Sequence, residues 1–390
     1  MKLKFLTAGE SHGPALVAIL DGLPAGLPLS LEVIDRDLAR RQQGVGAGPR
    51  MKIEHDEAHL LGGVMAGVTT GAPLAIMIEN RDHEKWRGKP VEPLTAPRPG
   101  HADLSGAIKY GFSDLRPALE RASARETAAR VAVGAACRQL LAQFGITVGG
   151  YVTAIGEVNA ELDKLAYPER ITRAAESDVN CPDPQAAEAM RLRIRRVMDE
   201  RDTLGGVIEV VVLSLPPGLG SFRQWDSRLE AALGAAVLSI PAVKGVEIGP
   251  AFANARLPGT QVHDPILLDG DALTRPTDRS GGLEGGITTG QPLIVRAAMK
   301  PIATTLTPQA TVDLASGEPS PTRYERSDFC PVPRAVVIVE AMVAFVLADA
   351  LLDKLGGDSL AEMLPRFETL RGARLADLRM DNTPHTWWPE

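Results

Sequence analysis

The sequence predicts an α+β fold: a layered sandwich with central helices between two mostly antiparallel sheets, and an internal pseudo-twofold repeat. Three observations predict it. Glycine-rich motifs recur in the same order, each half has a strand followed by a capped helix, and each half ends in a long Ala/Val-rich helix. Both long helices are apolar around most of their circumference, so they must be covered on more than one side. The helices are therefore expected in the middle, with the sheets outside.

The repeat is clearest in one glycine-rich motif. Gly62–Leu74 matches Gly281–Leu293 without gaps, and both read Gly-Gly, Gly, Thr-Thr-Gly and Pro-Leu at the same spacing. Upstream matches lie in the same order: His12–Leu27 with Leu204–Leu219, and Ser30–Leu38 with Ser221–Leu229. Ordered matches of this kind favour a duplicated half over coincidence.

Each half is expected to contain the same elements in the same order. Apolar strands at 17–20 and 207–213 end in Pro/Gly turns. Ser30 is expected to cap a helix running toward Arg41, and Ser221 to cap a helix from Gln224 toward Leu238. The long helices follow at about 122–144 and 334–355, and each ends at a glycine.

The whole chain, residues 1–390, is interpreted as a single domain. The repeated halves are placed at about 1–150 and 200–356. The polar segment at about 159–201 has little strand character and is interpreted as a helical insertion, and residues from about 365 to 390 as a peripheral tail.

Composition excludes several classes of protein. The net charge of -7 argues against a nucleic-acid partner. The cysteines are three and widely spaced, which favours a reducing, cytoplasmic location over a disulfide framework: Cys137, Cys181 and Cys330. The most apolar segment, 335–352, contains Glu340 and Asp349, so it is expected to be a buried helix and not a membrane span.

The charge distribution is uneven. Residues 40–138 hold 15 Lys and Arg against 11 Asp and Glu, whereas the remainder holds 27 against 38. Ordinary surface scatter would explain this bias, and so would a region that binds anions.

Two histidines stand in tight turns. His12 lies between Ser11 and Gly13, and His101 follows Pro99-Gly100. A turn holds an imidazole near the surface, where it can exchange protons near neutral pH. The alternative for each is a hydrogen bond to its own loop.

A third pair, His55 and His59, has the i,i+4 spacing of a zinc-protease motif. That motif needs Glu directly after the first His, and this chain has Asp56 there, so a solvated strand fits equally well. We expect no metal.

The segment Arg121–Thr127 opens the first long helix. Ser123 and Glu126 have the spacing of a capping box. Arg121 and Arg125 beside a helix N-terminus form a ready site for phosphate or carboxylate, and both roles are compatible.

Together these segments resemble the chorismate synthase family over nearly the whole chain, from Thr7–Gly13 to Gly356–Leu360. Seven further motifs stand in the family's order: Arg98–Asp103, Arg121–Thr127, Asp202–Gly206, Lys244–Gly249, Gly281–Gly290, Lys300–Thr304 and Arg326–Cys330.

The resemblance implies conversion of 5-enolpyruvylshikimate 3-phosphate to chorismate and phosphate by an anti-1,4-elimination. It implies a requirement for reduced FMN, with NADPH only an indirect source of electrons, a homotetramer, and possible help from a separate flavin reductase. It also implies site residues. His12 would protonate the departing phosphate, His101 would maintain the protonation state of the flavin, and Asp328 would help to remove the flavin N5 proton.

By the same resemblance, FMN would contact Arg121, Ala122, Ser123, Ala242, Gly285, Lys300, Pro301, Ile302, Ala303, Thr304 and Arg326. Substrate anions or the FMN phosphate would be held by Arg41, Arg50, Arg98, Arg125 and Arg326. Two departures from the family stand out. Ala47 replaces a common arginine of the substrate or NADP site, and Pro241 precedes Ala242 where Gln or Asn is common.

Two rival hypotheses remain. One is a flavin-binding protein without lyase activity, disabled by Ala47. The other is a metal hydrolase that uses His55 and His59.

Overall fold

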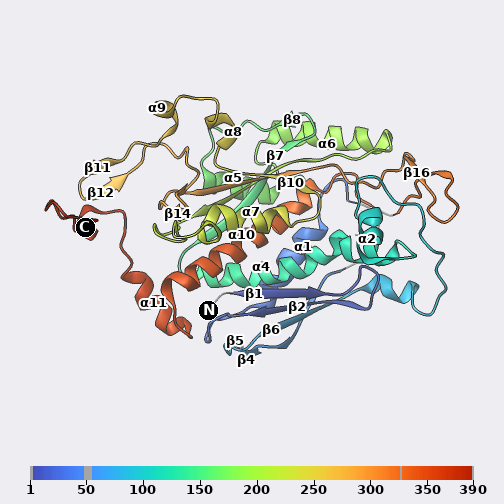
Figure 1. Cartoon of the computed structure of the whole chain (residues 1–390), viewed down its shortest axis with the longest axis horizontal. Helices are drawn as coiled ribbons and strands as arrows, with labels where there is room; N and C mark the ends of the chain where they lie inside the picture. The colour runs from blue at the N-terminus through green and yellow to red at the C-terminus, as the bar shows by residue number, and fades with distance from the viewer. Residues whose placement is uncertain (1–2, 48–54, 326, 389–390) are drawn as a thin grey trace.

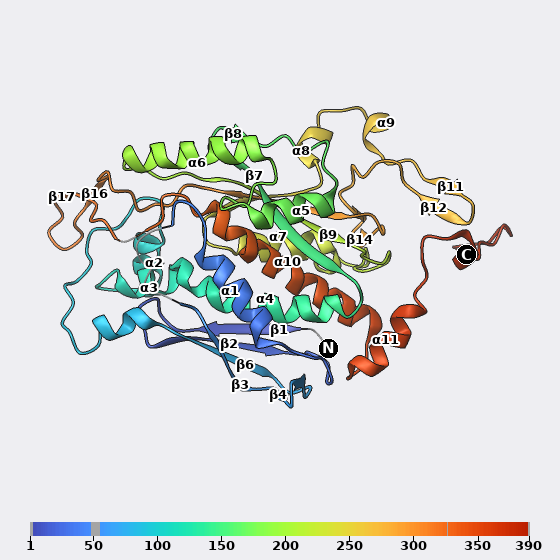
Figure 2. The same ribbon diagram turned by 180° about the vertical axis from the view of Figure 1, so that it is seen from behind.

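The structure is a computed structural model that describes residues 3–47, 55–325 and 327–388. Two antiparallel sheets enclose a layer of helices (Figures 1 and 2). One sheet has the strand order β1-β2-β6-β3: Lys4–Ala8, Ala15–Asp21, Leu74–Glu79 and Ala58–Gly62. The other has the order β10-β15-β9-β7-β8: Val243–Ile248, Leu293–Met299, Gly206–Leu213, Thr147–Ile155 and Val158–Asn159. The predicted fold class is confirmed.

Helices α1 (Leu31–Gln42), α4 (Thr127–Ala142), α7 (Leu229–Leu238) and α10 (Val332–Leu355) fill the space between the sheets. By length and composition α10 could cross a membrane, but 83% of its most apolar window is buried inside the protein. It packs on α1, α4, α7, β7 and β9, as expected for a core helix. At its centre Glu340 accepts hydrogen bonds from Arg40, Arg138 and the Gly150 N–H. This buried ion cluster joins three helices and one strand.

The α4–α10 crossing is very close. A Cβ added to Gly134 would lie 2.2 Å from the Ala341 Cβ, so only glycine fits there.

The repeated motif has the same hydrogen bonds in both copies. The Thr69 N–H donates to Leu27 O (2.9 Å), and its hydroxyl accepts from the Leu27 N–H and donates to Pro24 O. Thr288 makes the corresponding three bonds to Leu219 and Pro216. Each threonine is the last residue of a short hairpin: β4–β5 (Val64–Met65, Val68–Thr69) and β13–β14 (Leu283–Glu284, Ile287–Thr288).

Beyond this motif, the two halves differ in length. The Leu29 N–H donates to Gly67 O, and the matching donor to Gly286 O is the Leu229 N–H. Residues 221–228 are therefore extra in the second half, and the predicted parallel of Ser30–Leu38 with Ser221–Leu229 is wrong. The Ser221 side chain accepts from Arg223 N, a 3₁₀ turn follows at Trp225–Ser227, and α7 starts only at Leu229.

The N-terminal boundary of the first long helix also differs from the prediction. Helix α3 (Arg116–Ala122) ends just before Ser123, whose backbone is extended. A 3₁₀ turn, Ala124–Glu126, then leads into α4. Ser123 caps that turn by accepting from Arg125 N, but the Glu126 carboxylate binds Thr7 and Arg130 instead of completing a capping box.

The remaining elements lie around this sandwich. The predicted cap at Ser30 is present, and the segment predicted to be helical contains α5 (Tyr167–Glu176) and α6 (Pro184–Asp199). Shorter elements are α2 (Asp103–Tyr110), α8 (Ala251–Asn254), α9 (Gly259–Val262), β11 (Leu267–Asp269), β12 (Ala272–Thr274), β16 (Ala310–Val312), β17 (Pro319–Pro321) and α11 (Leu360–Glu368). The C-terminal segment pairs with the β11–β12 hairpin through Ala272 and Arg374.

Candidate active site

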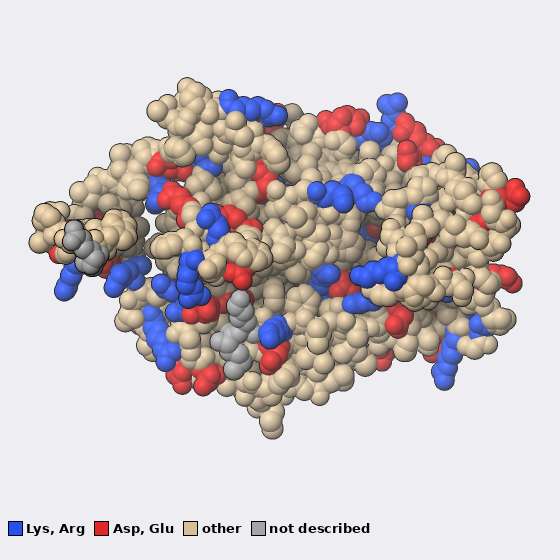
Figure 3. Space-filling view, in the orientation of Figure 1, with Lys and Arg blue, Asp and Glu red and all other residues tan. Residues whose placement is uncertain are grey.

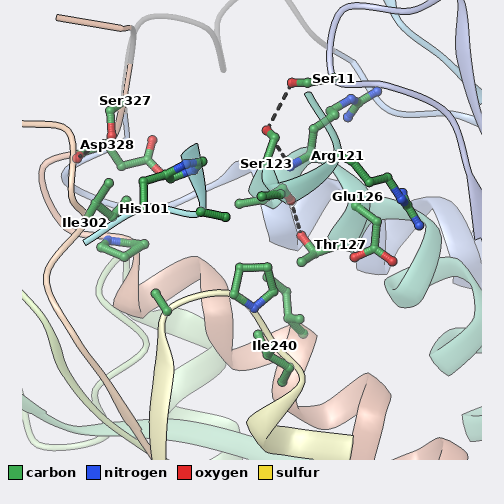
Figure 4. Close-up of a pocket in the computed structure, with 18 of the residues that line it drawn as sticks. Ser11, His101, Arg121, Ser123, Glu126, Thr127, Ile240, Ile302, Ser327 and Asp328 are labelled. Atoms are coloured by element: carbon green, nitrogen blue, oxygen red, sulfur yellow. Dashed lines mark hydrogen bonds between the residues drawn. The ribbon is translucent and has the colours of Figure 1, made fainter. Parts of the chain in front are cut away.

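A cavity of about 990 Å³ opens between the edge of the first sheet, the α3–α4 junction and the N-terminus of α10. Its other walls come from residues 239–242, 299–304 and 325–328. In Figure 4, His101 and Asp328 lie on one side of this space, and Ser11, Ser123 and Arg121 on the other. Typical small-molecule pockets measure roughly 300–1,000 Å³, so this one lies at the large end of that range.

Most of the residues predicted for the site line this one cavity: His12, Arg41, Arg98, His101, Arg121, Ala122, Ser123, Arg125, Ala242, Lys300, Ile302, Ala303, Thr304 and Asp328. Three predicted positions are not among the lining residues. Pro301 is an exposed neighbour of the wall, Ala47 is half-buried elsewhere, and Gly285 is exposed on the β13–β14 hairpin. Arg50 and Arg326 lie outside the described residues.

His12 is held by a carboxylate. Its Nδ1 lies 2.7 Å from Glu120 Oε1, and its backbone N–H donates to Glu120 Oε2 (2.8 Å). The Trp86 ring packs against the imidazole at 4.6 Å between centroids. Burial by itself raises the pKa of the Glu120 carboxyl, but the hydrogen bonds and charge of His12 outweigh it, so this pKa is lowered. Glu120 is therefore an anion beside the imidazole at neutral pH.

His101 has a similar partner in its own turn. Its Nδ1 lies 2.6 Å from Asp103 Oδ1, and Arg98 donates to both oxygens of that fully buried carboxylate. Burial by itself raises the pKa of Asp103, but the bonds from His101 and Arg98 outweigh it and hold the pKa well below its usual range. Gly100 shapes this turn with a φ of 77°, and its carbonyl accepts from Lys300 Nζ (2.5 Å).

The arginines of the cavity differ in how their donors are used. Arg125 donates to Asn80, Asp56 and Glu79 O, and is therefore anchored in the protein. Arg41 shares the Asp56 carboxylate (2.6 Å), but its buried Nε has no hydrogen-bond partner among the described residues. A buried donor without a partner is costly, so the Arg41 Nε is an exception among the buried polar atoms of this region.

Arg121 and Asp328 also have protein partners. Arg121 donates to the Thr7 carbonyl (3.0 Å) at the outer edge of β1. Asp328 accepts a hydrogen bond from Arg334 (3.0 Å) at the start of α10. The Ser11 and Ser123 hydroxyls are 3.0 Å apart, which ties the loop before His12 to the α3–α4 junction.

Sequence reasoning missed the carboxylates that organise the site. Asp103 stands two residues after His101, a spacing that could have indicated a pair. Glu120 and Asp56 gave no such signal, because Glu120 is 108 residues from His12 and Asp56 is 69 from Arg125.

Among the described residues, no group of three His, Cys, Asp or Glu side chains could hold a metal ion. His55 and His59 are both exposed, and His59 lies in strand β3.

Acidic and basic side chains are intermixed on the face shown in Figure 3.

A large cavity lined by six guanidinium groups of the described residues and by two carboxylate-held imidazoles defines an enzyme suited to a polyanionic ligand and to proton transfer. The family profile described as chorismate synthase matches residues 3–352. The chain belongs to the chorismate synthase family.

Relatives and a solved structure agree. Chorismate synthase of Trichlorobacter lovleyi is 53% identical over 378 residues, covering 93% of this chain and 96% of that protein. The enzymes of Chlorobaculum tepidum and Aquifex aeolicus are 50% and 51% identical, covering 95% and 94% of this chain and 98% and 96% of theirs. A crystal structure of chorismate synthase superposes with a TM-score of 0.78 at 44% identity, covering 94% of this chain and 97% of that one.

Proposed function

We propose that the chain is a carbon–oxygen lyase that converts 5-enolpyruvylshikimate 3-phosphate to chorismate and phosphate. The reaction is an anti-1,4-elimination: the C3–O bond to phosphate and the C6–H bond break, and a new double bond forms without net redox change. The observation that carries the proposal is the single cavity that joins His12, His101 and the guanidinium groups. The family of the chain supports the same reaction.

The residues of the cavity fit this substrate, which has two carboxylates and a phosphate. Arg41, Arg98 and Arg125 line the cavity, and guanidinium groups are the side chains best suited to bind carboxylates and phosphate. His12 protonates the departing phosphate. Glu120 on Nδ1 directs that proton transfer through Nε2.

The cavity also fits reduced FMN. Its walls contain small and apolar residues against which a flat ring can pack, among them Ala122, Ala242, Ile302 and Ala303. When bound, reduced FMN supplies transient electron density to the allylic system. His101 holds a proton near the cofactor and Asp328 accepts one. Arg121 and Lys300 line the same cavity and are suited to the cofactor phosphate.

We further propose a homotetramer in the cytoplasm, with NADPH only an indirect source of electrons and flavin reduction provided separately. The position of Gly285 supports assembly into an oligomer. The resemblance assigns Gly285 to the cofactor site, yet in this chain it lies on an exposed hairpin and does not line the cavity. A neighbouring copy could bring this hairpin to the site.

An anaerobic assay tests the function. Purified protein, the enolpyruvyl substrate and dithionite-reduced FMN should release phosphate, whereas oxidised FMN should give no turnover. FMN binding without phosphate release would favour a flavoprotein without lyase activity. Activity that is lost with a chelator and independent of flavin would favour a hydrolase.

A further inference from the structure

We infer that Glu120 is the positioning residue of His12: it fixes the ring tautomer and the loop that presents the imidazole to the cavity. The inference rests on the proposed function, because it assigns a role within proton transfer to the leaving phosphate.

Three hydrogen bonds connect Glu120 to the loop. Its backbone carbonyl accepts from Ser11 N (3.3 Å), Oε2 accepts from His12 N (2.8 Å), and Oε1 lies 2.7 Å from His12 Nδ1. The carboxylate thus binds the backbone and the ring of the same residue. A side chain used only for folding needs no contact with the ring, whereas this one sets both the position and the orientation of the imidazole.

The geometry also fixes which nitrogen acts. A carboxylate only accepts, so Nδ1 carries a hydrogen whenever this bond is made. Proton transfer to a ligand then passes through Nε2. The ring therefore presents Nε2 as the nitrogen from which a proton can reach the departing phosphate.

Other charged groups surround the pair. His83 Nδ1 lies 2.9 Å from the His12 carbonyl oxygen, and Glu10 approaches Gly13 in the same loop. The positive charge of Arg116 helps to lower the pKa of Glu120, and its guanidinium lies over the Trp86 ring. These groups contact the backbone of His12 or its partners, whereas Glu120 contacts the ring nitrogen.

The test compares Glu120→Gln, Glu120→Asp and His12→Ala in the anaerobic assay. Gln can accept from only one of the two donors of His12, so kcat should fall by about a hundredfold with little change in KM. The alkaline limb of the kcat/KM profile, where a proton donor is lost, should move to lower pH in Glu120→Gln. Glu120→Asp keeps the charge and should keep the wild-type limb. Glu188→Gln removes an exposed ion-pair partner in α6 and serves as a control with wild-type rates.

A double-mutant cycle decides whether Glu120 acts through His12. In a His12→Ala background, Glu120→Gln should cause little further loss. An equal loss in both backgrounds, an unchanged kcat in Glu120→Gln, or a rise in KM alone would overturn the inference. Oxidised FMN binding and the unfolding temperature confirm that each variant is folded. If the wild type releases no phosphate, the proposed function fails. The inference itself fails only if wild-type turnover is intact and Glu120→Gln does not behave as stated.

Discussion

His12 and Leu204 occupy matching positions in the two halves of the repeat, but their surroundings differ. The His12 N–H donates to the Glu120 carboxylate at the rim of the cavity. Nδ1 of the His12 ring contacts the same carboxylate. The Leu204 N–H donates to the carbonyl of Phe329 (2.8 Å), and its side chain is buried in the core. The turn in the first half thus places an imidazole at the cavity, whereas the matching turn in the second half places an apolar side chain in the core.

The same division extends around the cavity. Of the six described arginines that line the cavity, all but Arg334 come from the first half, which agrees with the positive balance of residues 40–138. The second half contributes much of the apolar wall, including Ile240, Pro241, Ile302 and Ile338. The shared hydrogen bonds of Thr69 and Thr288 show that the scaffold stayed the same while these side chains diverged.

Replacing the two matching side chains should separate chemistry from packing. His12→Ala should lower kcat by about a hundredfold to ten-thousandfold, the range for general acid–base groups. Leu204→Ala should cost about 2–5 kcal/mol of unfolding free energy and leave the rate per folded enzyme near that of the wild type. Phosphate release and denaturant unfolding measure the two effects. A His12→Ala variant with full activity would remove its catalytic assignment.

The helix crossing that joins the halves should show a contrast between two helical glycines. Gly134→Ala places a Cβ against Ala341 and should destabilise the protein by about 1–3 kcal/mol. Gly234→Ala, in α7, has nothing within 4 Å and should stabilise it by about 0.5–1 kcal/mol. Thermal unfolding measures both. Equal effects of the two changes would contradict the close crossing of α4 and α10.

The fold was largely predictable, because its signals are local or repeated. Ser30, the glycine ends of the long helices and the apolar circumference of α10 each act within a few turns of chain. The boundaries at Ser123 and Leu229 were not predictable. Both depend on a single residue, Ser123 or Arg228, that adopts extended backbone where a helical pattern continues.

The site was predictable only in part, for a different reason. The family resemblance located His12, His101 and the arginines, and the structure brings them to one cavity. Their carboxylate partners come from distant segments, and no local pattern pairs Glu120 with His12. That Arg41 and Arg125 share the carboxylate of Asp56 follows only from the geometry.

The two threonines of the repeated motif should be energetically equivalent. Thr69→Val and Thr288→Val each leave a buried backbone N–H and a carbonyl without their partner, at about 1–3 kcal/mol per site. Urea unfolding of the single and double variants should give similar single losses that add. A loss at only one threonine would show that the shared hydrogen bonds do not contribute equally.

Two aspartates, one in each half, should give stability a pH dependence of opposite sign. Burial by itself raises the pKa of Asp56, but Arg41 and Arg125 outweigh it and the pKa is lowered. Its stabilisation is present above the unfolded pKa, near 4, and is lost as the pH falls through the folded value. Asp278 is the reverse case. Burial, with Asp264 and Glu284 nearby, raises its pKa to about 6.

The smallest expected effect is that of Asp278→Asn. The folded protein binds more protons at Asp278 than the unfolded chain between about pH 4 and pH 6, so wild-type stability falls as the pH rises through that window. Asn carries no charge and removes this penalty. Asp278→Asn should therefore stabilise the protein at pH 7 by about 1 kcal/mol, a modest amount because the carboxyl is partly exposed to solvent. Unfolding midpoints between pH 4 and pH 8 should show the advantage growing to pH 6 and then staying constant. An advantage that is equal at every pH would mean that the charge of Asp278 is not its cause.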